Sequence, residues 1–372
     1  MIALIDQNRP RFDLGGSYGP NLVLEDLLSD DAIRALMNQV VLGYGTAQGD
    51  AELRAAIAEL HGVGPNDVVT TVGSMHALFL LAFVLCERGD EVVLATPAFP
   101  PMRSALDAVG AKQRVLPLSF DRGYQLDPAD IAPLLSRDTK LVSLASPQNP
   151  SGVAIPAGVL REVHSLMASV CPSAHLLVDD TYREATFGND PVEPSAIALG
   201  RKLVTVASFS KCHGAPGLRL GWVISRDPAL TEQLVRAKFH TVISNPAIEE
   251  FLALRILSIR ERILGERRAL LADCLERTQR WVSGNASLIE WVRPSAGAIC
   301  CVRLRPAAFD DAGVEHFYDK LASAGVLVAK GEWFDDSPRV FRLGFGHLPL
   351  PELDSAYDAM TDALARASRE PV

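Results

Sequence analysis

The chain has 372 residues, 48% hydrophobic and 22% charged, which is typical of a globular protein with room for more than one hydrophobic core. Its net charge of -9 comes without a lysine or arginine cluster, so we expect no nucleic-acid partner. The start lacks a basic and apolar leader, and the longest apolar run (77–86) has ten residues, so we expect neither a secretory signal nor a membrane span. The six cysteines lack Cys-x-x-Cys spacing, which favours reduced thiols in a cytoplasmic protein and no metal site.

Seven short apolar segments rich in β-branched residues lie in the first two-thirds of the chain. They are 67–73, 91–97, 112–118, 141–147, 175–182, 202–209 and 218–225. Helical patterns between most of them, such as 75–89 and 156–170, predict an α/β fold with a mostly parallel sheet covered on both faces. The link 210–217 is too short for a parallel crossover, so the last two strands should be antiparallel.

A different pattern follows these strands. A helical stretch runs from about 228 to 282 with a break near 244–246, and an α+β pattern continues to the C-terminus. The first 40 residues show no strand pattern. We therefore predict an N-terminal segment (1–40) packing with the small domain, a large domain (41–270) and a smaller α+β domain (271–372).

Several stretches carry residues suited to chemistry. In SFSKCHGAPGLRLGW (208–222), Lys211 precedes Arg219 by eight residues. A partly desolvated lysine amine can form a Schiff base with an aldehyde, and an arginine fork matches a phosphate. The other stretches are FDLGGSYGPN (12–21), LGYGTAQGDAELRAAIAEL (42–60), VGSMHAL (72–78), ATPAFPP (95–101), SPQNPSG (146–152), LLVDDTYREATF (176–187) and RVFRLGFGH (339–347).

Taken together and in this order, the motifs resemble those of fold type I pyridoxal 5′-phosphate (PLP) enzymes, in particular the class I/II aminotransferases of the aspartate aminotransferase superfamily. The resemblance covers essentially the whole chain. It implies a three-layer α/β/α fold with a seven-stranded, mostly parallel sheet and a smaller α+β C-terminal domain. It assigns Lys211 to the Schiff base, and Ser208 and Arg219 to the cofactor phosphate.

The same resemblance places residues around the cofactor ring. Asp179 would lie at the pyridine nitrogen, where a buried carboxylate raises the nitrogen pKa, and Tyr182 at the phenolic oxygen. Asp180 is the alternative to Asp179, because neighbouring strand residues point to opposite faces. Asn149 would donate to the phenolic oxygen, and Phe99 would stack on the ring unless it is a plain core residue.

The remaining cofactor contacts involve the phosphate. Ser74 and Met75 would contact it at a helix N-terminus, Met75 through its backbone N–H alone. Tyr44 would cross to the phosphate of a neighbouring subunit, which requires a two-fold homodimer.

For the substrate, the resemblance implies that Arg342 forks the α-carboxylate, with Arg339 as a weaker alternative. Asn149, Gly16 and Tyr18 would also contact the substrate. No clear second arginine marks a dicarboxylate side chain. Further candidates near the pocket are Glu184, His213, Trp333 and His347, and an acidic group among them would favour a basic substrate.

The expected function is transfer of an amino group from an L-amino acid to a 2-oxo acid through a Lys211 Schiff base, with Lys211, Asp179 and Tyr182 as catalytic residues. The freed lysine amine would be the general base. The alternative is elimination, replacement or a capreomycidine-type cyclisation on the same scaffold. A nicotinamide dehydrogenase is disfavoured, because no Gly-x-Gly-x-x-Gly follows a strand.

Overall fold

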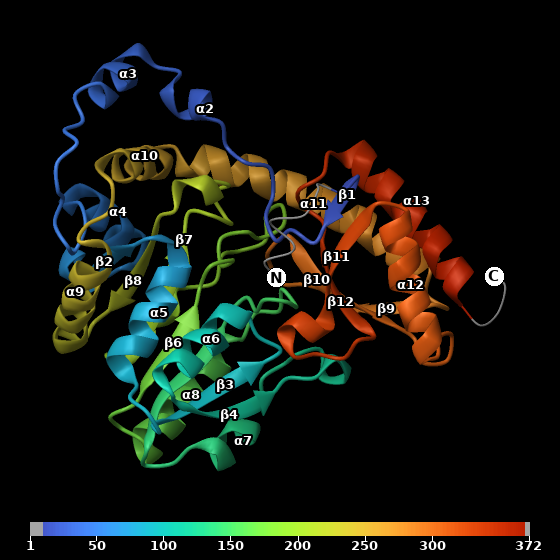
Figure 1. Ribbon diagram of the computed structural model, residues 1–372. Coiled ribbons are helices and arrows are strands. Elements are labelled where there is room, and N and C mark those ends of the chain that lie inside the picture. The colour runs from blue at the N-terminus through green and yellow to red at the C-terminus, as the bar shows by residue number, and fades with distance from the viewer. Residues whose placement is uncertain (1–9, 369–372) are drawn as a thin grey trace.

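The computed structural model describes residues 10–368 and contains two β-sheets with helices packed on both (Figure 1). Residues 1–9, which carry most of the stretch behind the prediction of no secretory signal, lie outside the described residues, as do residues 369–372. Within residues 10–368, no helix combines the length and apolar character needed to cross a bilayer.

All seven predicted strands belong to the larger sheet, in the order β2-β8-β7-β6-β5-β3-β4. Strand β8 is antiparallel to β7, as the short link predicted, and also to β2, whereas the other pairs are parallel. The strands are β2 (Val68–Thr71), β3 (Glu91–Thr96), β4 (Lys112–Pro117), β5 (Thr139–Ala145), β6 (His175–Asp179), β7 (Leu203–Ser208) and β8 (Gly221–Ser225).

Helices cover both faces of this sheet because its strands are apolar on both sides. Val92 and Leu94 belong to one core with α5 (Gly73–Leu85), α6 (Pro100–Val109) and α9 (Pro228–Val242). Val93 and Ala95 point the other way, into a core with α4 (Ala51–His61), α8 (Ala157–Val170) and α10 (Ala247–Ser258). The predicted three-layer α/β/α fold is confirmed.

The smaller sheet corrects one expectation. Its order is β1-β11-β12-β10-β9, and β1 (Phe12–Leu14) comes from the N-terminal segment, for which no strand was expected. Three residues are too few to show an alternating pattern, but Phe12 and Leu14 are buried and β1 pairs in parallel with β11. The other elements are β9 (Ile289–Val292), β10 (Ile299–Leu304), β11 (Val326–Lys330), β12 (Val340–Gly344), α12 (Asp311–Ser323) and α13 (Leu350–Ala367).

The predicted break in the long helical stretch is confirmed, since α9 ends at Val242 and α10 begins after Pro246. A second break at Ile259 starts α11 (Arg260–Gly284), which runs from the end of α10 toward the smaller sheet (Figure 1). Because α11 passes through position 270, the boundary between domains stays a prediction. Leu264 and Leu271 of this helix belong to the core of the smaller sheet.

The N-terminal strip that follows β1 packs tightly against β12. A Cβ atom added to Gly344, the last residue of β12, would lie 1.7 Å from the carbonyl oxygen of Gly16. Because both contacting groups are backbone, neither can move aside cheaply. Glycine at this position therefore lets residues 15–18 cross the end of the smaller sheet.

We expect Gly344→Ala to lower the free energy of unfolding by about 2 kcal/mol or more, because the added methyl group overpacks this crossing. Gly265→Ala is the control: Gly265 lies within α11, with nothing within 4 Å of an added Cβ. That change should stabilise the protein by about 0.5–1 kcal/mol. Urea midpoints followed by circular dichroism would contradict the packing argument if both variants shifted in the same direction.

Candidate functional site

The site begins where three parallel strands end, which is where sheets of this class bind ligands. Phe99 follows β3, Asn149 follows β5 and Asp179 ends β6, and the three residues line one cavity. The backbone N–H of Thr181 donates to Oδ1 of Asp179 at 3.0 Å. Burial raises the pKa of Asp179, although this bond and the charge of Lys211 oppose the shift.

The structure separates Asp179 from its alternative, Asp180. Asp180 does not line this cavity; its Oδ2 accepts a hydrogen bond from the Ser195 hydroxyl at 3.0 Å and lies 3.7 Å from Nε of Arg183. Burial raises the pKa of Asp180 to about 7. The two neighbouring carboxylates therefore face different surroundings, as their positions at a strand end predict.

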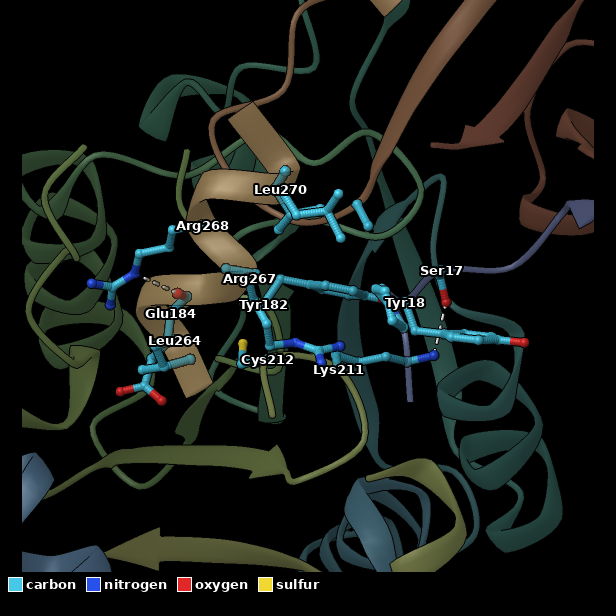
Figure 2. Close-up of a pocket in the computed structure, with 15 residues that line it drawn as sticks. Ser17, Tyr18, Tyr182, Glu184, Lys211, Cys212, Leu264, Arg267, Arg268 and Leu270 are labelled. Atoms are coloured by element: carbon cyan, nitrogen blue, oxygen red, sulfur yellow. Dashed lines mark hydrogen bonds between the residues drawn. The ribbon is translucent and has the colours of Figure 1, made fainter. Parts of the chain in front are cut away.

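Lys211 follows β7 and reaches the N-terminal strip (Figure 2). Its Nζ donates to the Ser17 hydroxyl at 2.8 Å and lies 5.3 Å from the centre of the Tyr18 ring. Burial, followed by the positive charges of Arg342 and Arg219, lowers the pKa of Lys211 to about 7, while the charge of Asp179 opposes the shift. Its amine is therefore substantially neutral near pH 7.

Tyr182 stands beside this lysine and shares its serine partner. The Tyr182 phenol is hydrogen-bonded to the Ser17 side chain, and Tyr182 and Lys211 line the same cavity. Burial raises the pKa of Tyr182 to about 12, so the phenol keeps its proton at neutral pH. Ser17 was not predicted; the strip drew attention to Gly16 and Tyr18, and nothing in the sequence singled out the serine between them.

The predicted phosphate contacts meet at the start of α5. The Arg219 guanidinium lies over Gly73, where an added Cβ would be 2.5 Å from Nη2. Gly221 pairs with Ser208 in the sheet, and a Cβ on Gly221 would lie 2.8 Å from the backbone nitrogen of Ser74. These glycines therefore let Arg219, Ser208 and the first backbone N–H groups of α5 lie close together, and this group of donors suits a phosphate.

Met75 and Tyr44, the other two predicted phosphate contacts, are both exposed within the chain. Met75 is 47% exposed on α5, and the contact of its backbone N–H with the phosphate stays a prediction. Tyr44 is 86% exposed and lines neither of the two cavities. His76, next to Met75, accepts a hydrogen bond from the backbone N–H of Val72 at 3.2 Å and supports the first turn of the helix.

Arg342 lies on β12 and is buried between both sheets and the strip. Its Nη1 donates to Oδ1 of Asn149 at 2.8 Å, and its Nη2 donates to the carbonyl oxygen of Gly15 at 2.6 Å. Among the described residues, its buried Nε has no hydrogen-bond partner. The alternative, Arg339, instead pairs with Asp311. The structure therefore places Arg342, and not Arg339, beside the other predicted site residues.

Of the two residues predicted in the N-terminal strip, only Tyr18 lines a cavity. Tyr18 lines the cavity beside Lys211 and stacks edge-on with His347 at 4.7 Å between ring centres. Gly16 packs against Gly344 and lines neither cavity. Trp333 also lines neither cavity and lies half-buried in the short helix Gly331–Phe334.

Glu184 lines the cavity beside Lys211, and His213 lies behind it. Oε1 of Glu184 lies 2.5 Å from Nη2 of Arg260, and Oε2 lies 3.5 Å from Nε2 of His213. Although burial opposes the shift, His213 and Arg260 lower the pKa of Glu184 to about 2. Among residues 10–368, no group of three or more His, Cys, Asp or Glu could hold a metal ion.

These donors fit PLP. A half-buried aromatic ring, a half-buried carboxylate and an amide line one cavity, a lysine amine of lowered pKa lies nearby, and the donors at the start of α5 suit the phosphate. Each kind of group matches a part of the cofactor: ring face, ring nitrogen, phenolic oxygen, aldehyde carbon and phosphate.

Known proteins match this chain over most of its length. Residues 18–360 match the family model described as aminotransferase class I and II. Capreomycidine synthase from Streptomyces vinaceus is 32% identical over 343 residues, which cover 90% of this chain and 84% of that protein. Arginine–pyruvate transaminase from Pseudomonas aeruginosa is 27% identical, covering 86% and 83%.

A solved structure extends the match to the fold. The crystal structure of a PLP-dependent aminotransferase from Streptococcus suis superposes with a TM-score of 0.90 at 24% identity, covering 99% of this chain and 97% of that one. The family model spans most of the chain, and the architecture and donor set agree with it. The chain therefore belongs to the aminotransferase class I and II family and is a PLP-dependent enzyme.

Proposed function

We propose that this protein moves an amino group from an L-amino acid to a 2-oxo acid, with Lys211 both holding the cofactor and moving the proton of the substrate α-carbon. When bound, PLP supplies an electron sink for that carbon. The observation that carries the role of Lys211 is the place of its amine, which lines one cavity with Tyr182 and donates to Ser17, and its lowered pKa of about 7 is consistent with that role. A neutral amine of this kind can accept a proton and return it.

The cofactor would be held by groups on three sides. Asp179 would keep the ring nitrogen protonated, Tyr182 and Asn149 would donate to the phenolic oxygen, and Phe99 would cover the ring face. The phosphate would lie at the start of α5. Its proposed contacts are Ser74, Met75, Ser208 and Arg219.

Arg342 would bind the substrate α-carboxylate. It now donates to Asn149 and to the Gly15 carbonyl, and a carboxylate would offer a stronger, charge-assisted partner to the same fork. Ser17 accepts a hydrogen bond from the Lys211 amine. We propose that it holds the free amine in place while the proton moves, and that the α-carbon is thereby fixed between Lys211 and Arg342.

We further propose that the working unit is a homodimer in which Tyr44 reaches the phosphate site of the partner. The dimer is supported by a patch of exposed apolar residues, because large exposed apolar patches usually mark interfaces. The exposed residues lie before α4, on α5 and near the end of α9, two helices that pack together: Val41, Leu42, Tyr44, Phe79, Phe83, Phe239 and Ile243.

Sedimentation at micromolar concentration should therefore give a dimer, and Phe83→Asp should shift it toward monomer because a charge would be buried in the interface. Val115→Asp, on the exposed side of β4 and outside this patch, serves as the control and should leave the dimer intact. A monomeric wild-type protein would contradict the proposal.

A second candidate is elimination or cyclisation on the same site. It is favoured by the likeness to capreomycidine synthase at 32% identity. The residues named above serve either reaction, since each begins with removal of the proton from the α-carbon. The fate of the amino group distinguishes the two.

The deciding experiment mixes the holoenzyme with each standard amino acid in the absence of a 2-oxo acid. For the true donor we expect one equivalent of 2-oxo acid per site, with the cofactor recovered as pyridoxamine phosphate. Release of ammonia or a cyclised product with PLP recovered unchanged would establish the second candidate. In Lys211→Ala, borohydride should no longer attach PLP to the protein, as read by mass spectrometry, whereas the control Lys202→Ala should behave as wild type.

Arg342→Lys tests the carboxylate site. Loss of the planar fork should raise KM for the amino acid by about 10-fold or more, with a smaller change in kcat. Arg339→Lys, at the position just before β12, is the control, and because its ion pair is with exposed Asp311 we expect a change of less than about 2-fold. Equal effects of the two substitutions would be incompatible with the assignment.

A further inference from the structure

The cavity shown in Figure 2 contains a cation that none of the roles above uses. Arg267 extends from α11 and lines this cavity together with Lys211 and Tyr18. Its guanidinium packs against two glycines: an added Cβ would lie 2.2 Å from Nη1 at Gly214 and 3.1 Å from Nη2 at Gly19. The chain therefore leaves space for this guanidinium beside the lysine loop.

The guanidinium of Arg267 is incompletely paired. Within residues 10–368, its buried Nη2 has no hydrogen-bond partner, and no carboxylate lies within ion-pair distance of Arg267. Burial lowers the pKa of Arg267. A desolvated cation without a counter-charge is unfavourable, and the strongest partner for a guanidinium fork is a carboxylate or another planar acid.

Glu184 is not that partner, although it lines the same cavity. Its carboxylate is already held by Arg260 and lies 3.7 Å from Nη2 of Arg183. The side chain of Arg268, also in the lining, donates to the backbone carbonyl of Glu184. The negative charge of Glu184 is therefore already balanced by arginines of this chain. This argues against the hypothesis that Glu184 would recruit a basic substrate.

The rest of the lining is mostly apolar. Its aliphatic members come from α11 and from the residue before β10: Leu264, Leu270, Leu271 and Ala298. The cavity thus combines a lysine amine, an aliphatic wall and an unpaired guanidinium. This combination matches an aliphatic chain that carries an acidic group.

We propose that Arg267 is a second anion-binding residue of the substrate site and that the substrate carries a side-chain carboxylate on a short aliphatic chain. The inference rests on the proposed function, in which Arg342 takes the α-carboxylate and Lys211 acts on the carbon beside it. The side chain then extends along the aliphatic wall to Arg267. The predicted substrate class is acidic, unlike the arginine named for one of the relatives.

Glutamate and glutamine give a matched pair of substrates, because they differ in side-chain charge and hardly in size. We expect the wild-type holoenzyme to favour glutamate in kcat/KM, and Arg267→Gln to reduce that preference by about 10- to 100-fold, mainly through KM. Arg262→Gln is the control, on the same helix but exposed, and should leave the preference unchanged. O-Phosphoserine in the same series tells whether a phosphate is accepted in place of the carboxylate.

A binding measurement tests the site without turnover. Glutarate and butyrate differ by one carboxylate, and calorimetry should show wild-type holoenzyme binding glutarate at least about 10-fold more tightly. Arg267→Lys, which keeps the charge without the fork, should fall between wild type and Arg267→Gln. Equal affinity for the two acids, or an unchanged preference in Arg267→Gln, overturns the inference. Transamination of neutral or basic amino acids alone would overturn it while leaving the proposed function intact, whereas absence of any 2-oxo acid would count against the proposed function itself.

Discussion

The fork of Arg342 is the contact on which the site depends. It joins β12 of the smaller sheet to Asn149 beyond β5 of the larger sheet and to Gly15 of the N-terminal strip. Three segments distant in sequence are thereby held around Lys211. A buried guanidinium needs such partners, because leaving it unpaired away from water is costly. The same need makes the fork ready to exchange its neutral partners for a carboxylate.

Local patterns in the sequence predicted most of the fold. The seven apolar segments became the seven strands of one sheet, and the short link before Arg219 correctly predicted the antiparallel strand, since both features depend on neighbouring residues alone. Strand β1 was missed because three residues carry no period. The helix break at Ile259 was also missed, because no proline or glycine marks it.

The candidate site was partly predictable for a similar reason. Lys211, Asp179 and Asn149 lie in motifs with fixed spacing, so a family resemblance finds them. Ser17 and Arg267 do not, because their importance comes from long-range packing: Ser17 meets Lys211 across 194 positions. The choice between Asp179 and Asp180 likewise required knowing which face of the strand end is the cavity.

The packing of helix α11 against the smaller sheet fixes the distance between Arg267 and Arg342. Leu264 and Leu271, on either side of Arg267, pack in the same core as Phe341 and Leu343, the neighbours of Arg342 on β12. The two guanidinium groups are therefore carried by one packed body, and the same core includes Cys212, the residue next to Lys211. A ligand that bridges both arginines must match their separation. Chain length would then be selected by the packing of an apolar core that the ligand never touches.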